Sequence, residues 1–66
     1  MIKKVLESLT DKQRNGVAAL KAAYQNADKE QKKYCSERIC GYVDGLTDAE
    51  VITMRGRQSL YIYMTL

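Results

Sequence analysis

Four carboxylates in the second half of this 66-residue chain are the side chains best placed for chemistry: Glu37, Asp44, Asp48 and Glu50. Paired carboxylates bind Mg²⁺ or act as general acid and base. The chain contains no His, so nucleophilic catalysis by Ser or Cys lacks its usual base. A chain this short also rarely builds a cleft that excludes water. We therefore expect a non-enzymatic protein with no cofactor and no small-molecule substrate, in which the carboxylates are solvated or pair with Arg55 and Arg57.

Two cysteines, Cys35 and Cys40, lie in a segment that is predicted to be helical. On a helix their Cα atoms are about 8–9 Å apart, which exceeds the ~7 Å reach of a disulfide. We expect free thiols that pack as small apolar side chains, as suits a reducing cytoplasm. A reactive thiol or an intermolecular bridge is the alternative. Without His, two cysteines do not complete a zinc site within one chain, so no metal is expected.

The composition describes one small domain spanning residues 1–66, with 45% hydrophobic and 29% charged residues. A chain of this length buries only about 60% of its unfolded surface, which leaves room for a single core. It has no run of about 18 apolar residues that would span a membrane. Its first residues do not have the pattern of a secretory signal, so we expect a cytoplasmic protein.

Apolar spacing predicts two helices in the first third of the chain. The first, over residues 2–9, has apolar residues at i, i+3, i+4 and i+7: Ile2, Val5, Leu6 and Leu9. Thr10 and Gln13 form a capping-box pattern, which predicts a second helix over about 11–26. The same apolar face continues across residue 10, so fusion of the two helices is left open.

A third helix is predicted to begin after Asp28, a good N-cap residue. We expect it to bury the apolar residues that recur at spacings of three and four: Tyr34, Cys35, Ile39, Tyr42, Val43 and Leu46. It could end at Gly45, with Thr47 capping the next helix, or run through to Ala49, with Thr53 as the next cap. We favour the longer helix because Gly41 and Gly45 then share one face that a neighbouring helix could approach closely. Such packing would offset a cost of about 1 kcal/mol per Gly relative to Ala.

The apolar tail, residues 60–66, fits two structures. As a helix beginning at Met54 it is apolar on all sides and must be buried on more than one side. As a strand it would pair with residues 51–54 across a turn at residues 55–58. We favour the helix, and hence an all-α fold with three or four bundled helices. The alternative is a set of helices plus a C-terminal β-hairpin at about 50–65.

The same tail predicts a protein partner, because a largely apolar segment of this length at one end exceeds what a single small core readily covers. The chain also has five Tyr and no Phe or Trp, and Tyr suits half-exposed interface positions. On a helix, Tyr61 and Tyr63 are about 200° apart, so we expect that they do not face the same core. A homodimer or another protein would cover the excess. The candidate partner-binding residues are Tyr34, Tyr61, Ile62, Tyr63 and Leu66.

Nucleic acid is the alternative partner. Residues 1–33 carry eight basic and four acidic side chains, whereas residues 34–66 carry three basic and four acidic ones. Residues 34–66 can also be arranged as helix, turn and second helix, in outline a helix-turn-helix. With the hairpin instead of the last helix, this half would be winged-helix-like, and residues 55–58 would form the tip of the wing. In that reading the chain is a small DNA-binding regulator, and its contact residues would be Arg55, Arg57 and Gln58, assisted by Lys32 and Lys33.

The segments GYVDGLTDAEVIT (residues 41–53) and RQSLYIYMTL (residues 57–66) resemble the ends of short uncharacterised proteins carried on phages and conjugative elements of gut bacteria. The resemblance covers about residues 40–66 and includes no catalytic motif, so it assigns no functional residue. It implies an accessory protein of a mobile element. Such proteins commonly block a host factor, including CRISPR effectors, or regulate the DNA of their own element. Glu50 stands where a helix-ending glycine is expected.

Overall fold

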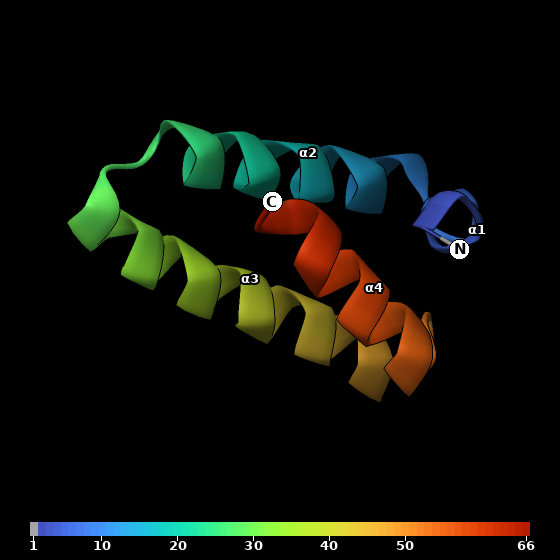
Figure 1. Ribbon diagram of the computed structural model, residues 1–66. Coiled ribbons are helices and arrows are strands. Elements are labelled where there is room, and N and C mark those ends of the chain that lie inside the picture. The colour runs from blue at the N-terminus through green and yellow to red at the C-terminus, as the bar shows by residue number, and fades with distance from the viewer. Residues whose placement is uncertain (1) are drawn as a thin grey trace.

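The computed structural model describes residues 2–66, and these form four α-helices and no strand: α1 (Ile2–Glu7), α2 (Asp11–Asn26), α3 (Lys29–Asp48) and α4 (Met54–Met64). The expected all-α class is confirmed, and the alternative C-terminal hairpin at about 50–65 is wrong. Helices α2 and α3 form a long antiparallel hairpin, and α4 runs back diagonally from the end of α3 to the middle of α2 (Figure 1). The molecule measures 31 × 19 × 19 Å.

Each of the three longer helices begins at the N-cap residue that the sequence predicts. The hydroxyl of Thr10 accepts the backbone N–H of Gln13 at 3.1 Å, and the Gln13 side chain accepts the N–H of Thr10 in return. Asp28 and Thr53 accept the N–H groups of Gln31 and Gly56 at 2.8 and 3.1 Å. These caps satisfy N–H groups that have no partner inside the helix. The cap at Thr10 also keeps α1 and α2 separate.

The end of α3 is a Schellman turn built around a residue other than glycine. Glu50 adopts the left-handed conformation, with φ at 61°. Its N–H bonds to the carbonyl of Thr47 at 3.0 Å, and the N–H of Val51 bonds to the carbonyl of Leu46 at 2.9 Å. The hydroxyl of Thr47 donates to the carbonyl of Val43 and caps nothing. The longer version of the third helix is therefore confirmed, and the alternative end at Gly45 is wrong.

Helix α4 lies at the centre of the packing, in contact with α1, α2 and α3. Its Leu60 and Met64 are fully buried together with Ile39 and Val43 of α3. The core is completed by Val5, Leu9, Val17, Leu46 and Ile52. This packing on several sides explains why a segment that is apolar on all sides is a helix. It also corrects the expectation for Tyr61 and Tyr63, because both pack against this one core.

The glycines that allow close packing are not the pair that the sequence suggested. A Cβ on Gly41 or Gly45 would meet no atom within 4 Å, so the expected close approach of a helix at this pair is wrong. A Cβ on Gly16 of α2 would instead lie 2.6 Å from the hydroxyl oxygen of Tyr42. That hydroxyl donates to the carbonyl of Gln13 at 3.1 Å and ties α3 to α2. Among residues 2–66, no helix is both long and apolar enough to cross a membrane.

Candidate protein-docking site

The outer face of α4 carries the largest apolar side chains that the fold leaves uncovered near the chain's C-terminal end. Ile62 is 51% exposed and Leu66 is 78% exposed. Together with Ser59, Tyr63 and Ile2 they line a shallow hollow of about 280 Å³, which we call the docking pocket. The four lining residues from the C-terminal segment follow the spacing i, i+3, i+4 and i+7, so they form one stripe along the helix surface.

The core holds this stripe in place from the opposite side of α4. Leu60 and Met64 lie four residues apart on the inner side and are fully buried. The end of the helix is fixed by Lys21 of α2, whose ammonium donates to the carbonyl of Tyr63 at 2.6 Å. The same ammonium lies 4.1 Å from the centre of the Tyr63 ring, a cation–π contact. One lysine therefore fixes both the backbone and the ring of a residue that lines the docking pocket.

Ile2 reaches the pocket from α1, a helix of only six residues. A helix this short has little stability of its own. It is held by Val5 and Leu9, which belong to the core, and by Arg14 of α2. The guanidinium of Arg14 donates to the carbonyls of Leu6 and Leu9 at 3.0 and 2.7 Å, where the chain leaves α1. It also pairs with Asp11, which fixes its direction.

The fold brings three of the five predicted partner-binding residues together: Ile62, Tyr63 and Leu66. Tyr61 is half-buried against the core and does not line the docking pocket. Tyr34 is 68% exposed, which corrects the expectation that α3 buries it. It lies near the opposite end of the molecule, in a second hollow of about 560 Å³ that is lined by Lys29, Glu30, Lys33 and Tyr34.

Sequence reasoning missed two residues of the docking pocket, Ile2 and Ser59. The helical spacing of Ser59 relative to Ile62 and Leu66 was a usable signal, because it puts all three on one stripe of a helix. Ile2 offered no such signal. Its place in the pocket depends on where α1 crosses α4, which is a contact between the two ends of the chain.

The residues proposed for nucleic acid do not form one surface. Arg55 and Gln58 are exposed on the first turns of α4, beside the end of α3. Lys32 and Lys33 lie in the first turns of α3, about 22 Å from its other end along the helix axis. Lys32 also has a partner inside the protein: its ammonium donates to the carbonyl of Tyr24 at 2.7 Å and lies 4.3 Å from the centre of that ring.

Arg57 is likewise engaged within the protein. Its Nε pairs with the carboxylate of Asp44, and a terminal nitrogen lies 3.5 Å from the sulfur of Cys40. The hydrogen bond from Arg57 to the Asp44 carboxylate raises the pKa of the guanidinium above its ordinary value. Its pKa therefore lies far above neutral, and the group stays charged in any physiological buffer. In the folded chain, this guanidinium fixes α4 against α3.

The groups with catalytic or metal-binding potential remain apart. Glu37, Asp48 and Glu50 are exposed, and Asp44 is the partner of Arg57. Among residues 2–66, no three His, Cys, Asp or Glu side chains gather closely enough to hold a metal ion. Within the same residues, every buried side-chain nitrogen or oxygen has a hydrogen-bond partner. Cys35 and Cys40 are free and half-buried.

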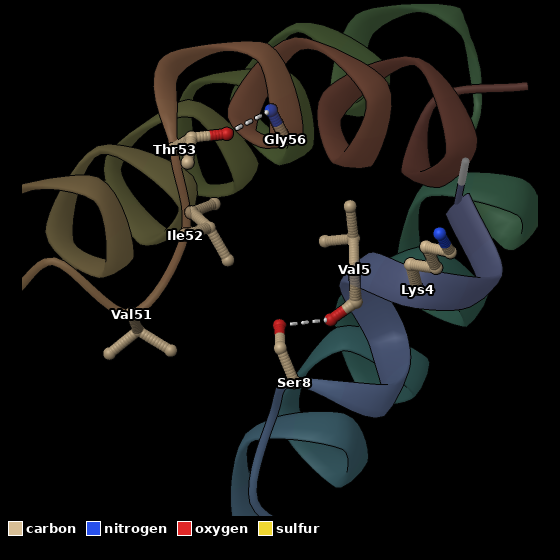
Figure 2. Close-up of a pocket in the computed structure, with 7 residues that line it drawn as sticks. All are labelled: Lys4, Val5, Ser8, Val51, Ile52, Thr53 and Gly56. Atoms are coloured by element: carbon tan, nitrogen blue, oxygen red, sulfur yellow. Dashed lines mark hydrogen bonds between the residues drawn. The ribbon is translucent and has the colours of Figure 1, made fainter.

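A further hollow of about 240 Å³ separates α1 from the turn between α3 and α4 (Figure 2). Its wall includes the apolar side chains of Val5 and Ile52, which point toward each other across the gap in Figure 2. The polar groups of the wall are already paired: the Ser8 hydroxyl donates to the Val5 carbonyl at 2.6 Å, and the Thr53 hydroxyl accepts from Gly56. Lys4 is the charged residue of this wall. We see packing space here and no arrangement that would select a ligand.

No protein-family model, curated protein or solved structure matches the chain.

Proposed function

We propose that this chain is a non-enzymatic binding protein that docks on a protein partner through the docking pocket of α4. The observation that carries the proposal is the exposure of Ile62 in α4 and of Leu66 just after it, at 51% and 78%, opposite the side of the helix that is buried in the core. Large apolar side chains gathered in one hollow are the usual mark of a contact surface. Because the core fixes α4 rigidly, binding would cost little ordering of the protein itself.

Residues 40–66 resemble proteins of mobile elements, and we therefore propose that the partner is a host effector protein, for example of the CRISPR type, which this chain blocks. A small rigid body would block such a partner sterically, by occupying a surface that the effector needs. Tyr34 is a second exposed aromatic residue, but polar and charged side chains surround it in its own hollow. The apolar environment of Ile62 and Leu66 therefore favours the docking pocket over Tyr34 as the contact surface.

Site-specific photo-crosslinking in living cells tests the proposal. A photoreactive amino acid at Gln58, which is exposed beside the docking pocket, is expected to give an adduct with one partner protein. The same amino acid at Tyr34 is expected to give none. Replacing Ile62 by Gln removes about 2 kcal/mol of apolar burial, which should weaken the adduct about tenfold or more.

The matched control is Met54→Gln, because Met54 is 70% exposed on the same helix and lies outside the docking pocket. This variant should keep the adduct at the level of the parent chain. Equal adducts from positions 58 and 34, or an adduct that Ile62→Gln leaves unchanged, would contradict docking through this face.

The alternative proposal, a small DNA-binding regulator, rests on Arg55 and Gln58 at the exposed start of α4 and on the turn that joins α3 to α4. In that case binding to duplex DNA should fall steeply with salt, because bound cations are released from the phosphates. Arg55→Gln should reduce both the affinity and the salt slope. Absence of DNA binding at low salt, together with the crosslinking result above, would favour the protein partner.

A further inference from the structure

Each element that builds or supports the docking pocket carries a basic side chain next to a lining residue in the sequence or in contact with one. Lys3 directly follows Ile2 on α1 and is exposed. Arg55 is exposed one helical turn before Ser59 on the same side of α4, and α4 contains no acidic residue. On α2, Lys21 holds the carbonyl and the ring of Tyr63. The apolar pocket therefore has basic side chains near it on α1, α2 and α4.

The shape of the pocket follows from its position on a helix. Its lining residues from Ser59 to Leu66 extend over two turns of helical spacing, about 10 Å along the axis. Ile2 of α1 adds an apolar side chain beside this stripe. A partner helix lying along such a stripe contacts it with apolar residues at the same spacing of three and four. An amphipathic helix thus matches both the length and the repeat of this surface.

Building on the proposed function, we propose that the docking pocket binds an amphipathic helix of the partner that carries acidic residues on both sides of its apolar stripe. Acidic flanks would face Lys3 and Arg55 and would orient the helix as well as speed its association. A second copy of this chain fits less well. A two-fold interface places the same patch on both sides, so the cations of one copy would face those of the other.

Two synthetic peptides of about four helical turns test this inference. Both carry the same apolar residues at i, i+3, i+4 and i+7; one has Glu at the flanking positions and the other has Lys. Fluorescence anisotropy with the full chain is expected to show at least about tenfold tighter binding of the Glu peptide. The variant Lys3→Glu/Arg55→Glu should reverse this preference, while far-UV circular dichroism stays unchanged.

Two further variants separate the apolar contact from simple charge attraction. Ile62→Gln keeps the net charge and should weaken binding of the Glu peptide about tenfold, whereas Met54→Gln should leave it unchanged. Equal affinity for both peptides, or a preference that the double charge reversal does not change, overturns the inference. A dimer in sedimentation that Ile62→Gln dissociates also overturns it, because the pocket then holds a second copy.

The outcomes for the partner helix and for the proposed function can be told apart. A crosslink from position 58 that depends on Ile62, combined with no binding of the Glu peptide, would support docking on a protein and contradict only the proposal of an acidic partner helix. Peptide binding that depends on Ile62, combined with no crosslinked protein in cells, would contradict the proposed function. It would still support the preference of the docking pocket for an acidic amphipathic helix.

Discussion

The two ends of the α2–α3 hairpin have the same apolar repeat but differ in what covers it. At one end, Ile39 and Val43 of α3 are fully buried beneath α4. At the other end, Tyr34 lies five residues before Ile39 and is 68% exposed. No residue between positions 18 and 38 is fully buried. The pattern of apolar residues therefore identifies a face of a helix, whereas burial of that face needs a third element.

The length of α4 determines how much of the apolar face of the α2–α3 hairpin it buries. With 11 residues it extends over about 16 Å, whereas α3 with 20 residues extends over about 30 Å. The shorter helix can fill the space between α2 and α3 at one end only, as Figure 1 shows. The hairpin end around residues 24–34 is left to local contacts. We expect its amide hydrogens to exchange faster than those of the α4 end, because fewer buried contacts oppose local opening.

The largest contrast between the two ends is expected from truncating one apolar residue in each. Ile39→Ala should lower the free energy of unfolding by about 3 kcal/mol, since it removes a fully buried side chain. Tyr34→Ala should change it by no more than about 0.5 kcal/mol. Urea titrations followed by circular dichroism at 222 nm measure both values.

The first of these losses is large for a domain with a total stability of roughly 3–10 kcal/mol. The milder variant Ile39→Val, expected to cost about 1 kcal/mol, keeps the comparison measurable if Ile39→Ala unfolds. Similar losses at positions 34 and 39 would show that the hairpin end is covered as well as the α4 end.

Two glycines in helix interiors should respond oppositely to Ala. Gly41→Ala should raise the free energy of unfolding by about 1 kcal/mol, because its Cβ would meet nothing within 4 Å and the helix gains propensity. Gly16→Ala gains the same propensity but displaces the Tyr42 hydroxyl from the Gln13 carbonyl. We expect it to be about 1–2 kcal/mol less stable than Gly41→Ala.

A double-mutant cycle tests the assigned cause. In a Tyr42→Phe background the displaced hydroxyl is absent. The effect of Gly16→Ala on the free energy of unfolding should therefore be about 1 kcal/mol more favourable there than in the parent chain. If the effects of the two substitutions simply add, the contact with Tyr42 is not what makes position 16 sensitive.

Local signals explain which parts of this fold the sequence could predict. Thr10, Asp28 and Thr53 act on N–H groups within three residues of themselves, so the starts of α2, α3 and α4 followed from short-range chemistry. The choice between helix and hairpin for the tail was harder, because its Tyr, Ile and Thr residues favour a strand. Packing of α4 against three other helices decides that choice, and such packing depends on the whole chain.

Long-range geometry explains what the sequence could not predict. The exposure of Tyr34 depends on how far α4 extends, and the roles of Gly16 and Gly41 depend on which face of each helix meets a neighbour. The docking pocket was predicted only on its α4 side, because the contribution of Ile2 requires the first helix to cross the last one. Helical spacing thus identified part of the candidate site, and contacts between the two ends of the chain complete it.

A smaller change in the free energy of unfolding is expected from a substitution in the turn between α3 and α4. Glu50→Gly should raise the free energy of unfolding by about 1 kcal/mol, because Glu50 has a φ of 61° and a left-handed backbone is costly for a residue with a Cβ. Glu50→Ala is the control: it removes the same charge but retains the Cβ. Equal stabilities of the Gly and Ala variants would assign any gain to the charge at the end of α3 and not to the backbone.

The smallest contrast concerns two lysines that make the same pair of contacts at the two ends. Lys21 binds the carbonyl and ring of Tyr63, and Lys32 binds those of Tyr24. The Tyr24 carbonyl also accepts the N–H of Ala27, at 3.3 Å, so it keeps a partner when Lys32 is replaced. We expect Lys21→Met to cost about 1 kcal/mol and Lys32→Met about half of that, measured by the same urea titrations. If Lys32→Met lowered the free energy of unfolding more than Lys21→Met, the contact of Lys32 with the end of α2 would stabilise the fold more than the contact between α2 and α4. That result would contradict the view that packing of α4 is what stabilises this protein most.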